Sequence, residues 1–318
     1  MRLSHRPCIA ADLGECFDSL CDAFAYPPEL RGQVPNVWTE WLRLGALSAH
    51  VVEGRAGDGA RQRLGLAGTV FVRPSWLDDV RARGRPYLPA DLVRRWLAGE
   101  RPVLTPDEIR ENGLRENLTV FFVCNALANR NLTDELRLAV NAEWSEVLYG
   151  LRSCSIDSMW IEVYGAKARD WIAGCGMRVK DDFARHWAEN PSARPGPEEQ
   201  PFLLGCGRLE ARDQPGSHAS FLFSRDHPVF GFTVRQQELL LRAVDGATDE
   251  DLARSLRVSM SAVKKRWIAI YDKVGAVMPG WLEAADGDAT RGAEKRRHLL
   301  NHLREHPAEL HPVNATRD

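Results

Sequence analysis

The most regular alternation of apolar and polar positions lies between residues 232 and 275. Three short segments with helical spacing are separated there by two turn signals. In the last segment apolar residues recur every three or four positions, at Val263, Trp267, Ile270 and Val274. Residues at this spacing share one face of a helix, which must be buried. The pattern predicts a compact unit of three helices.

Side chains that can cap helices mark the starts of these segments. Thr233 and Thr248 each stand three positions before a glutamine or an aspartate, which is the spacing of a capping box. Ser259 is the expected cap of the third helix. Gly246 is expected to end the first helix in a left-handed conformation.

The inward face of the third helix leaves a polar face opposite it. This face carries Ser261, Lys264, Lys265, Ile268 and Asp272. Lysines and a hydroxyl on the free face of a short helix suit insertion into a DNA groove, where contacts to phosphate add affinity and contacts to base edges discriminate. A solvated basic face on an ordinary helix is the alternative interpretation.

At these residues the chain resembles the C-terminal DNA-binding domain of the LuxR/NarL (GerE-like) family of bacterial transcription regulators, over about residues 229–277. The matching residues are Phe232, Thr233, Arg235, Gln236, Glu238, Gly246, Asp251, Leu252, Ala253, Leu256, Val258, Ser259, Val263, Lys264, Ile270, Lys273 and Gly275. Ala262, Arg266 and Val274 depart from the family pattern. The resemblance implies a helix-turn-helix that binds double-stranded DNA.

The residues that the resemblance assigns to DNA binding are Thr233, Ser259, Ser261, Lys264, Lys265, Arg266, Ile268 and Lys273. Lys264 and Lys273 would contact the phosphate backbone, and Lys265 with Ile268 would face the bases. An amphipathic helix expected over 291–306, with Leu299, Leu300 and Leu303 on one side, is similar in position to the family's dimerising helix. We therefore expect a homodimer.

Strands and helices are mixed in the first 225 residues. Expected helices begin at Asp12 and at Thr105, where a capping box precedes Pro106, and others span 134–151 and 166–173. Expected strands span 49–53, 66–72, 118–124, 159–163, 177–179, 202–204 and 220–223. The unbroken apolar run 118–124 is typical of a strand covered on both faces. The predicted class is α+β, a mixed α/β domain followed by an all-α helix-turn-helix domain.

This order looks like the GCN5-related N-acetyltransferase (GNAT) fold over about residues 3–225. RPCIAADLGECFDSL is similar to the family's first strand and helix, and MWIEVYGAKARDWIAGCGMRV to its late strand, helix and strand. The family's acetyl-CoA loop should carry glycines after the central strand, but NALANRNLTDEL contains none. The loop pattern occurs once, at Gln62, Gly65 and Ala67, and leads into a strand there. We therefore expect a degenerate domain that senses a small-molecule effector or organises a dimer.

Candidate chemistry in this domain is sparse, and no catalytic residue is assigned. Tyr164 could serve as a general acid or could pack with Trp160 and Trp171. Cys124 is expected to be an inert strand cysteine, and Glu162, like Glu143 and Glu146, to lie on a solvated face. Four tryptophans could line an apolar ligand pocket or fill the core: Trp38, Trp41, Trp160 and Trp171.

Composition agrees with a soluble cytoplasmic protein. The 318 residues carry a formal charge of -2, so the basic region is local. The 7 cysteines form no CxxC pair, and the histidines lack ligand spacing, so no metal is expected. Neither a signal peptide nor a membrane-spanning run is found.

These features predict three segments: a GNAT-like sensor or regulatory domain over 1–225, a helix-turn-helix over 226–278, and a loop with a possible dimerisation helix over 279–318. The main interpretation is a sequence-specific transcription regulator of LuxR type. In the alternative interpretation the chain is an acetyl-CoA-dependent N-acetyltransferase of GNAT type fused to a DNA-binding domain.

Overall fold

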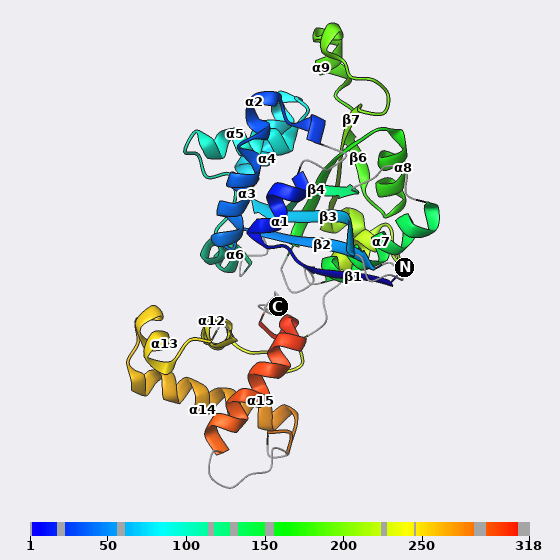
Figure 1. Cartoon of the computed structure of the whole chain (residues 1–318). Coiled ribbons are helices and arrows are strands. Elements are labelled where there is room, and N and C mark those ends of the chain that lie inside the picture. Colours follow the sequence, from blue (N-terminus) through cyan, green and yellow to red (C-terminus); the bar gives the residue numbers. More distant parts are fainter. Residues whose placement is uncertain are drawn as a thin grey trace. The chain divides into compact units, whose positions relative to one another are not determined.

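The computed structural model describes residues 2–17, 23–55, 61–113, 118–127, 133–149, 156–223, 228–244, 246–282 and 291–310. Internal contacts divide the chain into two units (Figure 1). The first comprises Met1–Leu151 and Ser155–Ser224, and the second contains Arg225–Asp318.

A seven-stranded sheet in the order β1-β2-β3-β4-β5-β7-β6 forms the centre of the first unit (Figure 1). Its strands are β1 (Arg2–Pro7), β2 (Leu47–Arg55), β3 (Arg61–Val72), β4 (Leu118–Leu127), β5 (Ile156–Tyr164), β6 (Arg178–Asp181) and β7 (Pro201–Gly207). Neighbouring strands are antiparallel except β4 and β5, which are parallel. A parallel pair needs a crossover connection, and α7 (Asp134–Tyr149) lies in it.

The predicted mixed α/β class of this unit is confirmed, together with several of its elements. The expected strands 49–53 and 66–72 lie in β2 and β3, which pair antiparallel with Leu47 opposite Val70. The residues 56–60 between them fall outside the described part of the chain. The expected central strand is β4, and residues 118–123 are buried. The capping box at Thr105 is present, since Thr105 N donates to Glu108 Oε2 at 2.9 Å.

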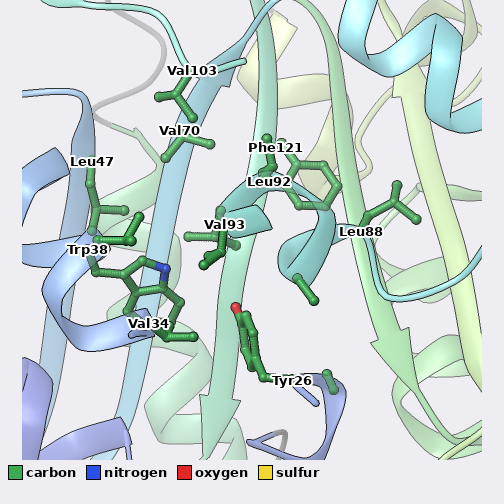
Figure 2. Close-up of a cluster of buried hydrophobic side chains, with 14 of the residues drawn as sticks. Tyr26, Val34, Trp38, Leu47, Val70, Leu88, Leu92, Val93, Val103 and Phe121 are labelled. Carbon is green, nitrogen blue, oxygen red and sulfur yellow. The ribbon is translucent and has the colours of Figure 1, made fainter. Parts of the chain in front are cut away.

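Helices cover the sheet and complete its core. The remaining ones are α1 (Ala10–Phe17), α2 (Pro28–Arg31), α3 (Val34–Arg43), α4 (Pro74–Arg83), α5 (Leu88–Leu97), α6 (Pro106–Gly113), α8 (Ala166–Gly174), α9 (Ala184–Glu189), α10 (Arg208–Arg212) and α11 (His218–Phe223). Figure 2 shows Trp38 of α3 and Leu92 and Val93 of α5 beside Val70 and Phe121 of the sheet. The two helices therefore close the core over β3 and β4.

Two sequence expectations for this unit need correction. Residues 220–223 form no strand but the end of α11, because Ser217 Oγ accepts the N–H of Ser220 at 3.1 Å and starts a helix. Helices α3, α4 and α5 were not predicted. Each has a proline in its first turn, at Pro35, Pro74 and Pro89, which is a helix-start signal.

The second unit is helical in its described part: α12 (Val234–Val244), α13 (Asp249–Ser255), α14 (Met260–Val277), α15 (Arg291–Glu305) and the 3-10 turn η4 (Pro307–Leu310). All three predicted caps are present. Thr233 pairs with Gln236, Thr248 with Asp251, and Ser259 Oγ accepts the N–H of Ala262 at 3.2 Å. Gly246 has a φ of 92°, a left-handed conformation that costs glycine nothing sterically.

One apolar core joins α12 to α15. Val263, Trp267, Ile270 and Val274 face inward as predicted. Leu299 and Leu303 are fully buried in the same core. The leucine face of α15 is thus covered within its own chain, which leaves those leucines no free surface for a partner. A homodimer stays a prediction.

Candidate functional site

The two parallel strands at the centre of the sheet separate along their length. β4 and β5 pair from Leu118 with Ile156 to Phe122 with Ile161, and in the described strands no pair follows. Thr69 of β3 pairs with Phe122 while Gly68 pairs with Cys124, so the intervening residue of β4 is bulged. A bulge bends its strand and increases the strand's twist. The bulge in β4 follows Phe122, the last β4 residue paired with β5 in the described strands.

A pocket opens where the strands part. Its lining residues come from β4, β5, α8, α3, α5 and the segment before α2: Ala25, Tyr26, Trp38, Pro89, Val123, Cys124, Asn125, Glu162, Val163, Tyr164 and Ala168. Figure 2 shows two of them, Tyr26 and Trp38, near α5. Their ring centroids lie 6.3 Å apart at 79°. Val123, Cys124 and Asn125 of β4, which follow the last residue paired with β5 in the described strands, border this pocket.

Glu162 is the one ionisable carboxylate of this lining. Its carboxylate accepts the backbone N–H groups of Tyr87 at 2.9 Å and Leu88 at 3.2 Å, which lie at the start of α5. The Tyr164 hydroxyl donates to Glu162 Oε1 at 2.6 Å. A helix start attracts negative charge, and these three donors hold the carboxylate in one orientation.

Burial changes the acidity of Glu162. Its residue is only 6% exposed, and desolvation raises its pKa to about 7, against the opposing effect of the bonds from Tyr164, Leu88 and Tyr87. A carboxyl group with this pKa exists in both protonation states near neutral pH. That is the property a general acid or base requires.

Tyr164 is held in place by its surroundings. Its ring is stacked on Tyr87, with centroids 6.3 Å apart, and meets the Phe24 ring edge-on at 4.9 Å. The next residue, Gly165, has a φ of 80°, and a Cβ there would lie 2.9 Å from the carbonyl oxygen of Glu198. The backbone that follows Tyr164 is thus fixed by close packing that requires glycine.

The structure decides between the sequence alternatives for these side chains. Tyr164 lines the pocket and bonds Glu162, and it stacks on Tyr87 rather than on tryptophans. The expectation that Glu162 lies on a solvated face is wrong, because β5 is covered on both faces and α5 begins over its carboxylate. Cys124 donates its S–H to Leu66 O at 3.3 Å and borders the pocket.

Only one of the four candidate tryptophans lines the pocket. Trp38 does so, whereas Trp41 is fully buried in the core. Trp160 is buried with the Arg81 guanidinium over its ring at 4.9 Å, and Trp171 is 41% exposed. A signal for Glu162 was present in the sequence, since it is the only acidic residue in the otherwise apolar run MWIEVY.

The residues assigned to DNA binding lie in the second unit and differ in exposure. Ser261, Lys264, Lys265 and Ile268 are exposed on α14. Arg266 is half-buried, because it stands one helical turn from the inward-facing Val263 and Ile270. These assignments, and duplex DNA as a partner, stay predictions.

Three further assigned residues make bonds within the unit. Lys273 donates to the carbonyl of Gly231, Thr233 belongs to the α12 capping box, and Ser259 caps α14. Each side chain thus has a structural role of its own.

Two further classes of site are absent from the described residues. They contain no group of three or more side chains that could hold a metal ion. No helix among them is long and apolar enough to cross a membrane.

No family model matches the chain, and neither does any curated protein. Among solved structures it is similar to FeeM, an N-acyl amino acid synthase from uncultured soil microbes, with 11% identity and a TM-score of 0.38 over 67% of this chain and 94% of that one. It is also similar to mutant forms of the spermidine/spermine N-acetyltransferase SpeG from Vibrio cholerae, with 12% identity and a TM-score of 0.37 over 67% and 98%. A third is the C-terminal condensation domain of Ebony in complex with beta-alanyl-dopamine, with 13% identity and a TM-score of 0.36 over 65% and 99%.

These similarities correct the main interpretation of the sequence. The first two structures are titled as an acyl synthase and an acetyltransferase, and none of the three is titled as a transcription regulator. The prediction that the chain is a LuxR-type transcription regulator is wrong on this comparison. At such low identity and TM-score the likeness does not extend to an activity.

Acetyl-CoA, implied by the alternative, fits this site only in part. The β4 edge at Val123 and Asn125, which pairs with no β5 residue in the described strands, suits the amides of a pantetheine arm, which can bond the backbone as a strand would. The diphosphate end has no matching cradle in the sequence. No glycine occurs between Asn125 and α7, and the first turn of α7 carries Asp134 and Glu135. Negative charges this early in a helix sequence disfavour a diphosphate at that helix start.

Proposed function

We propose that the first unit is an N-acyltransferase that moves an acyl group from a thioester to an amine in the pocket between β4 and β5. The observation that carries this proposal is the Tyr164–Glu162 pair, 2.6 Å apart at the point where the strands separate. The donor of the acyl group is a thioester. The acceptor is an amine, whose nitrogen attacks the thioester carbonyl.

Amine acylation requires the loss of protons from nitrogen. An ammonium must lose one proton before it can attack, and the nitrogen loses a second as the amide forms. Glu162, with its pKa near 7, takes the first proton. Tyr164 lines the same pocket and bonds this carboxylate, so its hydroxyl can pass a proton to Glu162 and receive one from the nitrogen.

The bonds in this step balance. The C–N bond of the amide forms, the C–S bond of the thioester breaks, and the departing sulfur takes up a proton and leaves as a thiol. Negative charge develops on the carbonyl oxygen during attack. We expect main-chain N–H groups of the β4 lining around Val123 to stabilise it.

The test uses the full chain, thioesters of pantetheine with acyl groups from acetyl to dodecanoyl, and phenethylamine as the amine. Thiol release that depends on the amine is expected, with an amide as the second product. Tyr164→Phe should lower kcat/KM by about 100-fold. Tyr271→Phe, which removes a phenol hydroxyl from α14 of the second unit, should change it little. Absence of amine-dependent thiol release with every donor would overturn the proposal.

The second unit has no part in this reaction scheme. Its helix-turn-helix class rests on the caps and the exposed lysines of α14 and stays a prediction.

A further inference from the structure

The pocket contains one buried negative charge surrounded by aromatic and apolar groups. Tyr26, Trp38 and Tyr164 contribute rings, and Glu162 contributes the carboxylate. Most of the remaining lining is aliphatic. Among the described lining residues there is no lysine, arginine or histidine. The local charge of this site is therefore set by Glu162.

Such a site recognises a cation with an apolar body. A carboxylate held by three hydrogen bonds in an apolar setting is complementary to an ammonium group, and ring faces add a cation–π attraction. The same site opposes a second carboxylate, because two like charges in a dry pocket repel each other and the described lining supplies no counter-ion.

We infer that the acceptor is a primary amine on an apolar or aromatic stem that carries no carboxylate, and that Glu162 selects it against the corresponding amino acid. This inference rests on the proposed function for the use of the amine, and adds the class of acceptor. Specificity of this kind arises from a repulsive element as well as an attractive one.

Four compounds with one phenyl skeleton isolate the charge that is recognised. Phenethylamine carries the ammonium, phenylalanine adds a carboxylate, phenethyl alcohol is the neutral analogue and hydrocinnamate carries only the negative charge. Binding of each to the full chain is measured by titration calorimetry above pH 7, without any acyl donor. Phenethylamine should bind at least about tenfold more tightly than the other three, which corresponds to ~1.4 kcal/mol.

Variants show whether Glu162 is responsible. Glu162→Gln should lose the preference for phenethylamine over phenethyl alcohol, and its retained binding of the alcohol reports a folded pocket. Asp157→Asn changes an exposed carboxyl at the other end of β5 and should keep the preference.

A second measurement tests the inference on the wild-type protein, so it applies even if the Glu162→Gln chain does not fold. In the wild-type protein the preference for the amine should shrink as the pH falls below about 7, because Glu162 becomes protonated. The other titratable groups of the described surroundings are Tyr164, which donates to it, Tyr26 and Cys124, which line the same pocket, and Tyr87, whose pKa is raised by burial and by the charges of Glu162 and Glu199. A change that is lost in a folded Glu162→Gln chain reports Glu162.

Two outcomes separate this inference from the proposed function. If phenylalanine binds and is acylated as well as phenethylamine, the inference is wrong and the acyltransferase assignment stands. If phenethylamine binds selectively but no thioester is consumed, the inferred selectivity of the pocket stands and the proposed acyltransferase function is wrong.

Discussion

Tyr164 and Glu162 lie two positions apart on β5, and the hydroxyl of the first bonds the carboxylate of the second at 2.6 Å. Residues at this spacing point to the same face of a strand. The start of α5 covers that face and supplies two further N–H donors to the carboxylate. A strand end, a helix start and a phenol thus converge on one buried charge.

The pH dependence of acyl transfer follows from Glu162. Because the ionised form accepts the proton and the pKa is about 7, kcat/KM should rise as the pH passes through about 7 and then level off. In Glu162→Gln this rise should disappear, with a loss of about 100-fold or more at pH 8. A pH–rate profile of both proteins checks this, and an unchanged rise in the variant would assign it to another group.

The same residue should make stability depend on pH. The folded pKa of about 7 lies above the ordinary value of 4.5, so the contribution of Glu162 is fully present below pH 4.5 and is lost as the pH rises through about 7. The full difference is on the order of 3 kcal/mol. Urea unfolding of the first unit between pH 5 and pH 8 should show this decline. A Glu162→Gln chain that declines equally would contradict it.

Gly205 on β7 should not tolerate a methyl group. A Cβ at this position would lie 2.7 Å from the Trp160 ring, closer than packed atoms approach. Gly205→Ala should lower the free energy of unfolding by ~1–3 kcal/mol through overpacking. Gly174→Ala is the matched control, because nothing lies within 4 Å of a Cβ there. Denaturant titration of both variants is the measurement, and equal midpoints would refute the packing argument.

Glu309 should stabilise the second unit. Its carboxylate is buried and accepts the N–H groups of Val229 at 2.6 Å and Phe230 at 3.0 Å. Glu309→Ala removes the acceptor of the buried Phe230 N–H and of the part-buried Val229 N–H, which should cost roughly 2 kcal/mol. Glu305→Ala removes an exposed carboxylate of α15 and should change stability by less than about 0.5 kcal/mol. Thermal unfolding of both variants measures the difference.

His302 should make the second unit sensitive to acid. Its ring packs against Trp281 at 5.0 Å and Phe230 at 5.4 Å. Burial lowers its pKa below 6.5, and the nearby His306 and His298 lower it further, against the opposing effect of Glu305. The stability contributed by the neutral ring is therefore present above pH 6.5 and is lost as the pH falls below it.

Replacement of this histidine provides the check. His302→Gln should unfold less steeply with acid than the wild type. His218→Gln, which changes an exposed histidine of the first unit, should leave the acid response of the second unit unaltered. The second unit's unfolding can be followed by hydrogen exchange of α14 amides, and an identical slope in His302→Gln would exclude this residue as the source.

The sequence by itself determined the local elements. The caps at Thr233, Thr248 and Ser259, and the inward spacing of α14, depend on residues within a few positions of one another, so a short stretch of chain specifies them. The apolar run of β4 likewise predicted a strand buried on both faces.

Tertiary structure alone decided the environment of each site. In the sequence Glu162 is a single acid in a strand. Its pKa is raised because tertiary packing buries it, while the N–H groups of Tyr87 and Leu88, more than seventy positions away, bond its carboxylate and oppose that rise. The spacing of the leucines in α15 predicted a dimerisation face, yet these leucines are buried in one apolar core with other residues of the second unit. Short-range spacing fixes which face of an element is apolar, but what covers that face depends on contacts between segments distant in sequence.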